Sequence, residues 1–147
     1  MINVLGPTLC SQAFARLYFS ARKDGRSAPP PGRIVSISSQ AAHVSLANHG
    51  AYCASKAALI GLTNCMASEW GPRGITANTV SPTVALTELG KKAWPEGPVR
   101  DDFLKTIPTG RFVMPEEVAD AIVWLCRDES GMVNGADVRV DGGFTIR

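Results

Sequence analysis

Residues 33–38 read RIVSIS, a short run in which apolar and β-branched side chains stand at alternate and at consecutive positions. Such a run is typical of a strand that is buried on both faces of a parallel sheet. A Pro/Gly-rich loop at residues 23–32 precedes the run, and a polar, irregular stretch follows it. We therefore predict a strand at 33–38.

Helical periodicity lies on both sides of this strand. Residues 3–21 are predicted to form a helix, with Pro7 close enough to its start to be tolerated. The residues near one face of that helix are Leu5, Leu9, Ala13, Phe14 and Leu17. Residues 51–70 form a second predicted helix, with Leu59, Leu62 and Met66 on one stripe and GPRG at its end.

The remainder of the chain continues the alternation. ITANTVSP at 75–82 reads as a strand, and residues 82–110 are irregular with brief helical pieces. A third helix is expected to begin at Pro115, with two acidic residues in its first turn. The segment ADVRVDGG at 136–143 is predicted to form the last strand, followed by a glycine turn. The order helix, strand, helix, strand, helix, strand predicts an α/β fold with a parallel sheet, in one domain at 1–147.

Composition excludes several classes of function. Fifteen basic and thirteen acidic side chains give a net charge of +2, and no basic run resembles a nucleic-acid arm, so no nucleic-acid partner is expected. There is no apolar run near the ~20 residues of a membrane span and no signal-peptide pattern, so we expect no membrane partner and a cytoplasmic setting.

Metal binding and disulfide formation are not expected either. The two histidines, His43 and His49, have no ligand spacing with another His or with Cys. The four cysteines show no C-x-x-C spacing and are interpreted as small hydrophobic residues in a reducing compartment.

The motif YCASK, residues 52–56, places Tyr52 and Lys56 four positions apart within the second predicted helix. That spacing puts a phenol and an ammonium on one helix face, where the cation favours the phenolate and the pair could exchange a proton with a carbonyl or alcohol oxygen. A Tyr with its ring in the core and a Lys in solvent is the alternative. Because such a pair arises in about 7% of shuffled chains of this composition, the pair alone leaves both readings open.

Ser39 ends the strand segment RIVSISS thirteen residues before Tyr52, at the strand end where parallel sheets bind ligands. With this spacing the chain resembles the short-chain dehydrogenase/reductase family, and the second Ser of SISSQAA fits the family position. The resemblance extends over essentially the whole chain. INVLG places a fourth catalytic residue at Asn3, and VSPTVALT, with Pro-Thr where many members have Pro-Gly, is similar to the family's nicotinamide-binding loop.

The resemblance implies a doubly wound Rossmann fold and NAD or NADP as cofactor. Tyr52 would be the general acid/base, Ser39 would hydrogen-bond the substrate oxygen, and Lys56 would lower the pKa of the tyrosine and contact the nicotinamide ribose. Asn3 would position a water linked to Lys56. Besides Tyr52 and Lys56, the residues implied to bind the cofactor are Pro82, Val84 and Thr87.

Within the family the chain looks most like the xylulose reductases and related polyol dehydrogenases, through NHGAYCASKAAL and SPTVALTELGKKAW. That likeness implies a small carbonyl or alcohol substrate, a ketose or its polyol, in contact with Ser39, His49 and Trp94. The alternative is that His49 is solvated on a loop and that Trp94 is a packing residue.

A glycine-rich strand-turn-helix for the cofactor diphosphate is not found in these 147 residues. The resemblance therefore implies the C-terminal portion of the fold, with the N-terminal cofactor-binding half missing, and we expect the isolated chain to be inactive. NAD and NADP cannot be told apart. The strand at 33–38 should have an uncovered edge.

A homo-oligomer through helices 3–21 and 51–70 is expected in the full enzyme. The alternative function is a non-catalytic interaction module that pairs through these helices.

Overall fold

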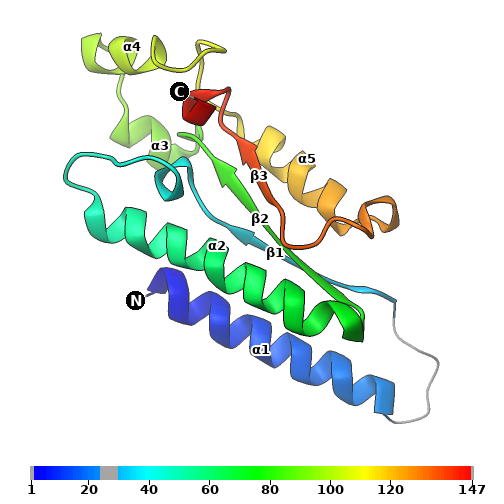
Figure 1. Cartoon of the computed structure of the whole chain (residues 1–147). Helices are drawn as coiled ribbons and strands as arrows, with labels where there is room; N and C mark the ends of the chain where they lie inside the picture. The colour runs from blue at the N-terminus through cyan, green and yellow to red at the C-terminus, as the bar shows by residue number, and fades with distance from the viewer. Residues whose placement is uncertain (1, 24–29, 147) are drawn as a thin grey trace.

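The computed structural model of the chain describes residues 2–23 and 30–146 (Figure 1). Most of the predicted Pro/Gly-rich loop, residues 23–32, therefore lies outside the described residues. The elements in chain order are α1 (Ile2–Lys23), β1 (Gly32–Ile37), η1 (Gln40–Ala42), α2 (Gly50–Trp70), η2 (Gly71–Arg73), β2 (Ile75–Pro82), α3 (Glu88–Ala93), α4 (Pro98–Leu104), α5 (Pro115–Cys126), η3 (Asp128–Ser130), β3 (Asp137–Val140) and η4 (Phe144–Ile146).

The three strands form one parallel sheet in the order β1-β2-β3, which confirms the predicted α/β class. Helices α1 and α2 lie side by side on one face, and α5 covers the other (Figure 1). The connections β1–α2–β2 and β2–α5–β3 move in the same direction across the sheet with their helices on opposite faces. They therefore have opposite hands, and one of them is of the uncommon left-handed kind.

The main core lies between β1, β2 and the two long helices. Its buried members are Ala15, Tyr18, Ile34, Met66, Ala67, Ile75 and Ala77. Gly32 allows the close approach of α1 to the sheet, because a Cβ there would lie 2.9 Å from Ile75 and 3.3 Å from the rings of Phe14 and Tyr18. The Tyr18 hydroxyl donates to the carbonyl of Gly74, which takes φ 90° in the turn before β2.

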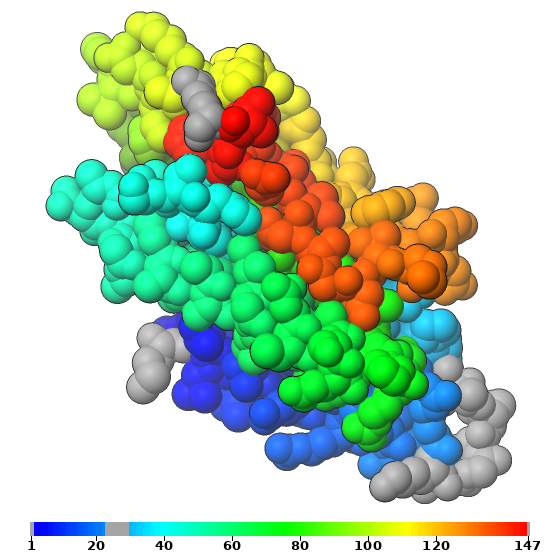
Figure 2. Space-filling model, in the orientation of Figure 1, coloured from blue at the N-terminus to red at the C-terminus, as the bar shows by residue number. Residues whose placement is uncertain are grey.

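The apolar stripe predicted on the first helix does not face this core. Leu5, Leu9 and Leu17 are 51%, 55% and 74% exposed, whereas the buried positions of α1 include Ala15 and Tyr18. Figure 2 shows α1 at the surface beside α2. The helix is therefore apolar on two sides, and only one of them is covered by the described chain.

The expected open edge of the sheet is present, because β1 is paired on one side only within the described residues. The four cysteines, interpreted as small hydrophobic residues, all have free thiols; Cys10, Cys65 and Cys126 are exposed and Cys53 is half-buried. Among the described helices, none is long and apolar enough to cross a membrane.

Two asparagines, the buried Asn78 and the exposed Asn134, attach the chain before β3 to the rest of the fold. The amide of Asn78 donates to the carbonyl of Val133 and accepts from the N–H of Ala136, both at 2.9 Å. Asn134 reaches in the opposite direction, accepting from the N–H of Ala77 and donating to the carbonyl of Ala67. These side chains replace ladder bonds and fix β3 beside β2.

Candidate active site

A cavity of about 780 Å³ opens beyond the carboxyl ends of β1 and β2, between the start of α2 and helix α3. Six of the nine predicted site residues line it: Ser39, His49, Tyr52, Val84, Thr87 and Trp94. Ligands bind at this end of parallel α/β sheets. The fold therefore brings six of the predicted residues together on one cavity, while Asn3, Lys56 and Pro82 lie outside its lining.

The two serines after β1 have different surroundings. Ser38 is 2% exposed, and its hydroxyl donates to the main-chain carbonyl of Lys56 at 3.0 Å, which attaches the strand end to α2. Ser39 lies on the cavity and caps η1, where its Oγ accepts from the N–H of Ala41 at 3.2 Å. Because that bond uses only a lone pair, the Ser39 hydroxyl keeps its proton for a ligand.

Tyr52 and Lys56 both project from the first turns of α2. The Lys56 Nζ lies 5.7 Å from the centre of the Tyr52 ring and donates to the carbonyl of Ile37 at 2.7 Å. Burial lowers the pKa of Lys56 below its usual 10.5, because the charged form loses solvation. Tyr52 is 40% exposed. The phenol therefore faces the cavity and the ammonium stands behind it at the end of β1.

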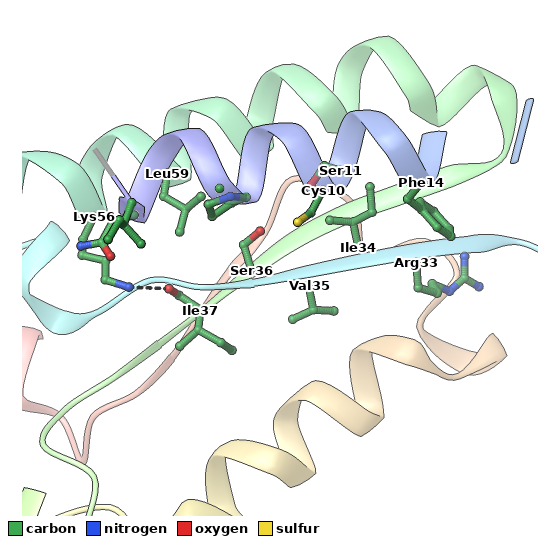
Figure 3. A pocket seen from close by; sticks show the side chains of 14 residues that line it. Cys10, Ser11, Phe14, Arg33, Ile34, Val35, Ser36, Ile37, Lys56 and Leu59 are labelled. Carbon is green, nitrogen blue, oxygen red and sulfur yellow. Dashed lines mark hydrogen bonds between the residues drawn. The ribbon is translucent and has the colours of Figure 1, made fainter. Parts of the chain in front are cut away.

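Asn3 is attached to the same helix by a residue that the sequence reasoning missed. Its Nδ2 donates to the Ser55 hydroxyl at 3.1 Å, and that hydroxyl donates to the carbonyl of Tyr52 at 2.7 Å. Asn3 and Lys56 line a second hollow, between α1 and β1 (Figure 3). Ser55 could have been noticed from its place inside YCASK, three residues after the tyrosine.

His49 and Trp94 face the cavity from opposite walls. The Nδ1 of His49 lies 2.7 Å from the carbonyl of Ala47, and because a carbonyl can only accept, Nδ1 carries the proton; in the neutral tautomer with this bond Nε2 is an acceptor. Trp94 follows α3, and its ring lies 4.5 Å from that of Phe103 and 5.7 Å from that of Phe112. Packing against two aromatic rings fixes the Trp94 ring at the cavity wall.

The loop after β2 is held by main-chain bonds. The Val113 N–H donates to Val84 and the Leu86 N–H donates to Val113, which forms an isolated parallel bridge around Ala85. Thr87 caps α3, accepting from the N–H of Gly90 at 3.0 Å. Pro82 ends β2 and leads into this loop. Its predicted neighbours Val84 and Thr87 are thereby placed on the cavity.

Two buried polar atoms on this cavity have no hydrogen-bond partner among the described residues. They are Oε1 of Gln40, a residue that is 4% exposed, and Oγ1 of Thr83, which is 6% exposed. Buried polar groups in proteins are nearly always paired, so unpaired ones on a cavity point to a ligand. Gln40, which directly follows Ser39, was not among the predicted site residues, and Thr83 stood out in the sequence only as a departure from Pro-Gly.

The described residues contain no cluster of His, Cys, Asp and Glu suited to a metal ion. This finding concerns residues 2–23 and 30–146 alone. The polar side chains on the cavity are hydroxyls, an imidazole and an amide, and the rest of its lining is aromatic and aliphatic. Their chemistry is that of hydrogen bonding and proton transfer.

Comparisons with known proteins identify relatives of this chain. A family model described as enoyl-(acyl carrier protein) reductase matches residues 1–145. The chain is 49% identical over 146 residues to D-threitol dehydrogenase of Mycolicibacterium smegmatis, covering 99% of this chain and 53% of that protein. It is 40% identical to L-xylulose reductase of Caenorhabditis elegans over 98% of this chain and 55% of that protein.

The fold of the chain also matches that of a solved structure. Gluconate 5-dehydrogenase of Burkholderia cenocepacia in complex with NADP and tartrate superposes with a TM-score of 0.87 at 31% identity, covering 99% of this chain and 54% of that one. The chain thus spans about half the length of the relatives that it matches.

Proposed function

The chain belongs to the short-chain dehydrogenase/reductase family, and we propose that it carries the catalytic part of a nicotinamide-dependent oxidoreductase that interconverts a ketose and a polyol. The observation that carries this proposal is the joint placement of the Ser39 hydroxyl and the Tyr52 phenol on one cavity, with the Lys56 ammonium behind the phenol ring. Proton transfer to a carbonyl oxygen needs an acid within hydrogen-bond reach, and a second donor on the same oxygen stabilises the charge that develops there.

The residues present fit the nicotinamide end of the cofactor. The Thr83 hydroxyl is buried without a partner, Thr87 caps α3, and both lie on the cavity with Val84. These groups suit the amide and nearby oxygens of a nicotinamide nucleotide. When bound, that cofactor donates or accepts the hydride at the substrate carbon. Whether NAD or NADP is used depends on groups outside this part of the fold.

The proposed proton chemistry follows from the hydrogen bonds. During reduction Tyr52 gives its phenolic proton to the carbonyl oxygen as the alcohol forms, and during oxidation it takes that proton back. Ser39 accepts from Ala41 and donates its own O–H to the same oxygen. The Lys56 charge favours the phenolate that remains after proton transfer. Asn3 uses Nδ2 on Ser55, which leaves its Oδ1 to hold a water toward Lys56.

A polyhydroxylated substrate suits the remaining cavity wall. His49 offers Nε2 and Gln40 offers Oε1 as acceptors for substrate hydroxyls, and Trp94 offers an apolar ring face with one N–H donor. The names of the two curated relatives, a threitol dehydrogenase and a xylulose reductase, support the same class.

This proposal is tested in a hybrid in which the chain replaces the matched part of the Mycolicibacterium relative. We expect kcat/KM to be higher for a pentulose or a tetritol than for an apolar ketone of similar size, and His49→Ala to shrink that preference. A hybrid that prefers the apolar ketone, or an unchanged preference in His49→Ala, would refute the assignment of a sugar or polyol substrate. The more general proposal of a nicotinamide-dependent oxidoreductase would still stand.

A second candidate function, a helix-mediated interaction module, is supported by the exposed stripe of Leu5, Leu9 and Leu17 on α1. A contiguous exposed apolar face marks an interaction surface. In the full enzyme this stripe would join two subunits into a homo-oligomer. Sedimentation of the chain and of Leu9→Lys tests this directly: self-association that the charge removes supports pairing through α1, and an unaffected monomer contradicts it.

A further inference from the structure

His43 and Asp137 form a bonded pair that the proposed proton chemistry does not use. His43 follows η1, and Asp137 begins β3, 94 positions later in the chain. The Nε2 of His43 lies 2.8 Å from Oδ2 of Asp137. Their side chains are 27% and 13% exposed, so the bond lies near the surface but is mostly covered. It joins the segment that follows the catalytic strand end of β1 to the far strand of the sheet.

The carboxylate of Asp137 is held by a second strand as well. Its Oδ1 accepts from the hydroxyls of Thr79 and Ser81, at 2.5 and 2.6 Å, and both of these residues are buried on β2. An ionised carboxylate can only accept, so the Nε2 of His43 carries the hydrogen of the third bond. Because two buried hydroxyls of the central strand fix the carboxylate, Asp137 is a rigid anchor for the imidazole.

His43 is joined to Ser39 through the single turn of η1. Ser39 caps the start of the turn, where its Oγ accepts from the N–H of Ala41 and its carbonyl accepts from the N–H of Ala42. His43 caps the end, and its N–H donates to the carbonyl of Gln40 at 3.0 Å. Since each of these bonds spans only two or three residues, a displacement of His43 is passed along the turn to Ser39.

The restraints on η1 come from two sides. The buried Ala41 and its neighbours lie against α2, which restrains the turn from one side. Among the residues that the structure describes, the bond from His43 to Asp137 is the one side-chain hydrogen bond that joins residues 39–43 to the sheet. Residues 45–48, which follow, form neither helix nor strand before α2 begins at Gly50. The His43 bond therefore limits the movement of the turn on its other side.

We propose that His43, anchored by Asp137, is a positioning residue for the Ser39 hydroxyl. His43 does not line the cavity, so it acts on the reaction only through η1. The inference rests on the proposed role of Ser39 as a donor to the substrate oxygen. A misplacement of about 1 Å in a reacting site can cost about 10²-fold in rate, and the loss of one donor to the developing charge costs about 10²- to 10³-fold. Loosening η1 should therefore lower kcat and leave cofactor affinity unchanged.

Two substitutions of His43 test this in the hybrid with the Mycolicibacterium relative. His43→Leu removes the donor to Asp137 and should lower kcat about tenfold or more. His43→Gln is the matched control, because the glutamine amide nitrogen reaches the place of Nε2 and still donates. Its kcat should stay within about threefold of the parent. Should His43→Leu fail to fold by circular dichroism, His43→Ala takes its place.

A double-mutant cycle distinguishes positioning from a general effect on the fold. In a Ser39→Ala hybrid the hydroxyl that His43 positions is gone, so adding His43→Leu should lower kcat by less than about twofold further. A residue that only stabilises the fold would lower kcat by the same factor with and without the Ser39 hydroxyl.

Amide exchange tests the positioning without relying on turnover. In the chain itself, the N–H groups of Ala41 and Ala42, which donate to Ser39, should exchange faster in His43→Leu and at the parent rate in His43→Gln. A parent hybrid without turnover would refute the proposed function, and the exchange rates would then decide the role of His43 in holding η1. The inference is overturned if His43→Leu leaves this exchange unchanged, if His43→Gln is as impaired as His43→Leu, or if the two substitutions in the cycle are additive.

Discussion

Replacing Thr83 by valine should stabilise the chain, whereas the same substitution at Thr63 should destabilise it. Both side chains are buried, at 6% and 1% exposure. The Thr63 hydroxyl donates to the carbonyl of Leu59 at 2.8 Å, while the Thr83 hydroxyl has no partner among the described residues. Valine has the shape of threonine without the hydroxyl, so the pair isolates the hydrogen bond.

The magnitudes follow from the cost of burying a polar group. Losing the Thr63 bond should lower the free energy of unfolding by about 1 kcal/mol, and relieving the unpaired Thr83 hydroxyl should raise it by about 1–3 kcal/mol. With a urea slope of about 2 kcal/mol per molar, the two unfolding midpoints should separate by about 1 M or more. If Thr83→Val destabilises the chain as much as Thr63→Val does, the hydroxyl is already paired in solution, and its assignment to a ligand is refuted.

Three further outcomes are expected from the structure. Because burial lowers the pKa of Lys56, the unfolded chain binds more protons than the folded chain, so the free energy of unfolding should rise as pH increases through the lowered pKa toward 10.5. Urea unfolding of Lys56→Met should lack this rise. An unchanged rise in the mutant would exclude Lys56 as its source. The hydrogen bonds from Arg111 hold the pKa of Glu117 at about 2, so the contribution of Glu117 to the free energy of unfolding is complete above pH 4.5 and is lost as pH falls toward 2. In acid titrations Glu117→Gln should remove this loss of stability. A mutant that still shows the loss would contradict the pairing with Arg111. Gly90→Ala would place a Cβ against the carbonyl oxygen of Ala85 and should displace α3, visible as faster amide exchange there. Unaltered exchange would show that the loop accommodates the methyl group without cost.

The elements and the cavity residues were largely predictable because they depend on local pattern. The strand at 75–82 was placed at its observed bounds, and the helix at 51–70 differs by one residue at its start. The predictions of these two elements needed only periodicity and end signals. Ser39 and Tyr52 were singled out by their spacing together with the family resemblance, and both line the cavity.

The features that were missed depend on contacts between distant segments. The pairing of Asn134 with Ala67 joins residues 67 positions apart, and no local pattern reports it. The stripe of Leu5, Leu9 and Leu17 has the periodicity of a core face, yet the covered side of α1 is the one with Ala15 and Tyr18. Gln40 is polar and lies in the short helix η1, so only its buried, unpaired Oε1 marks it as a candidate site residue.

The central claim is that Tyr52 transfers the proton in a nicotinamide-dependent oxidoreductase. Its most direct test is the turnover of the hybrid protein with Tyr52→Phe, followed by the absorbance of the reduced cofactor with a polyol substrate. We expect kcat to fall by about 10²- to 10⁴-fold while cofactor affinity, measured by titration, stays the same. A Tyr52→Phe hybrid that turns over at the rate of its parent would contradict the account.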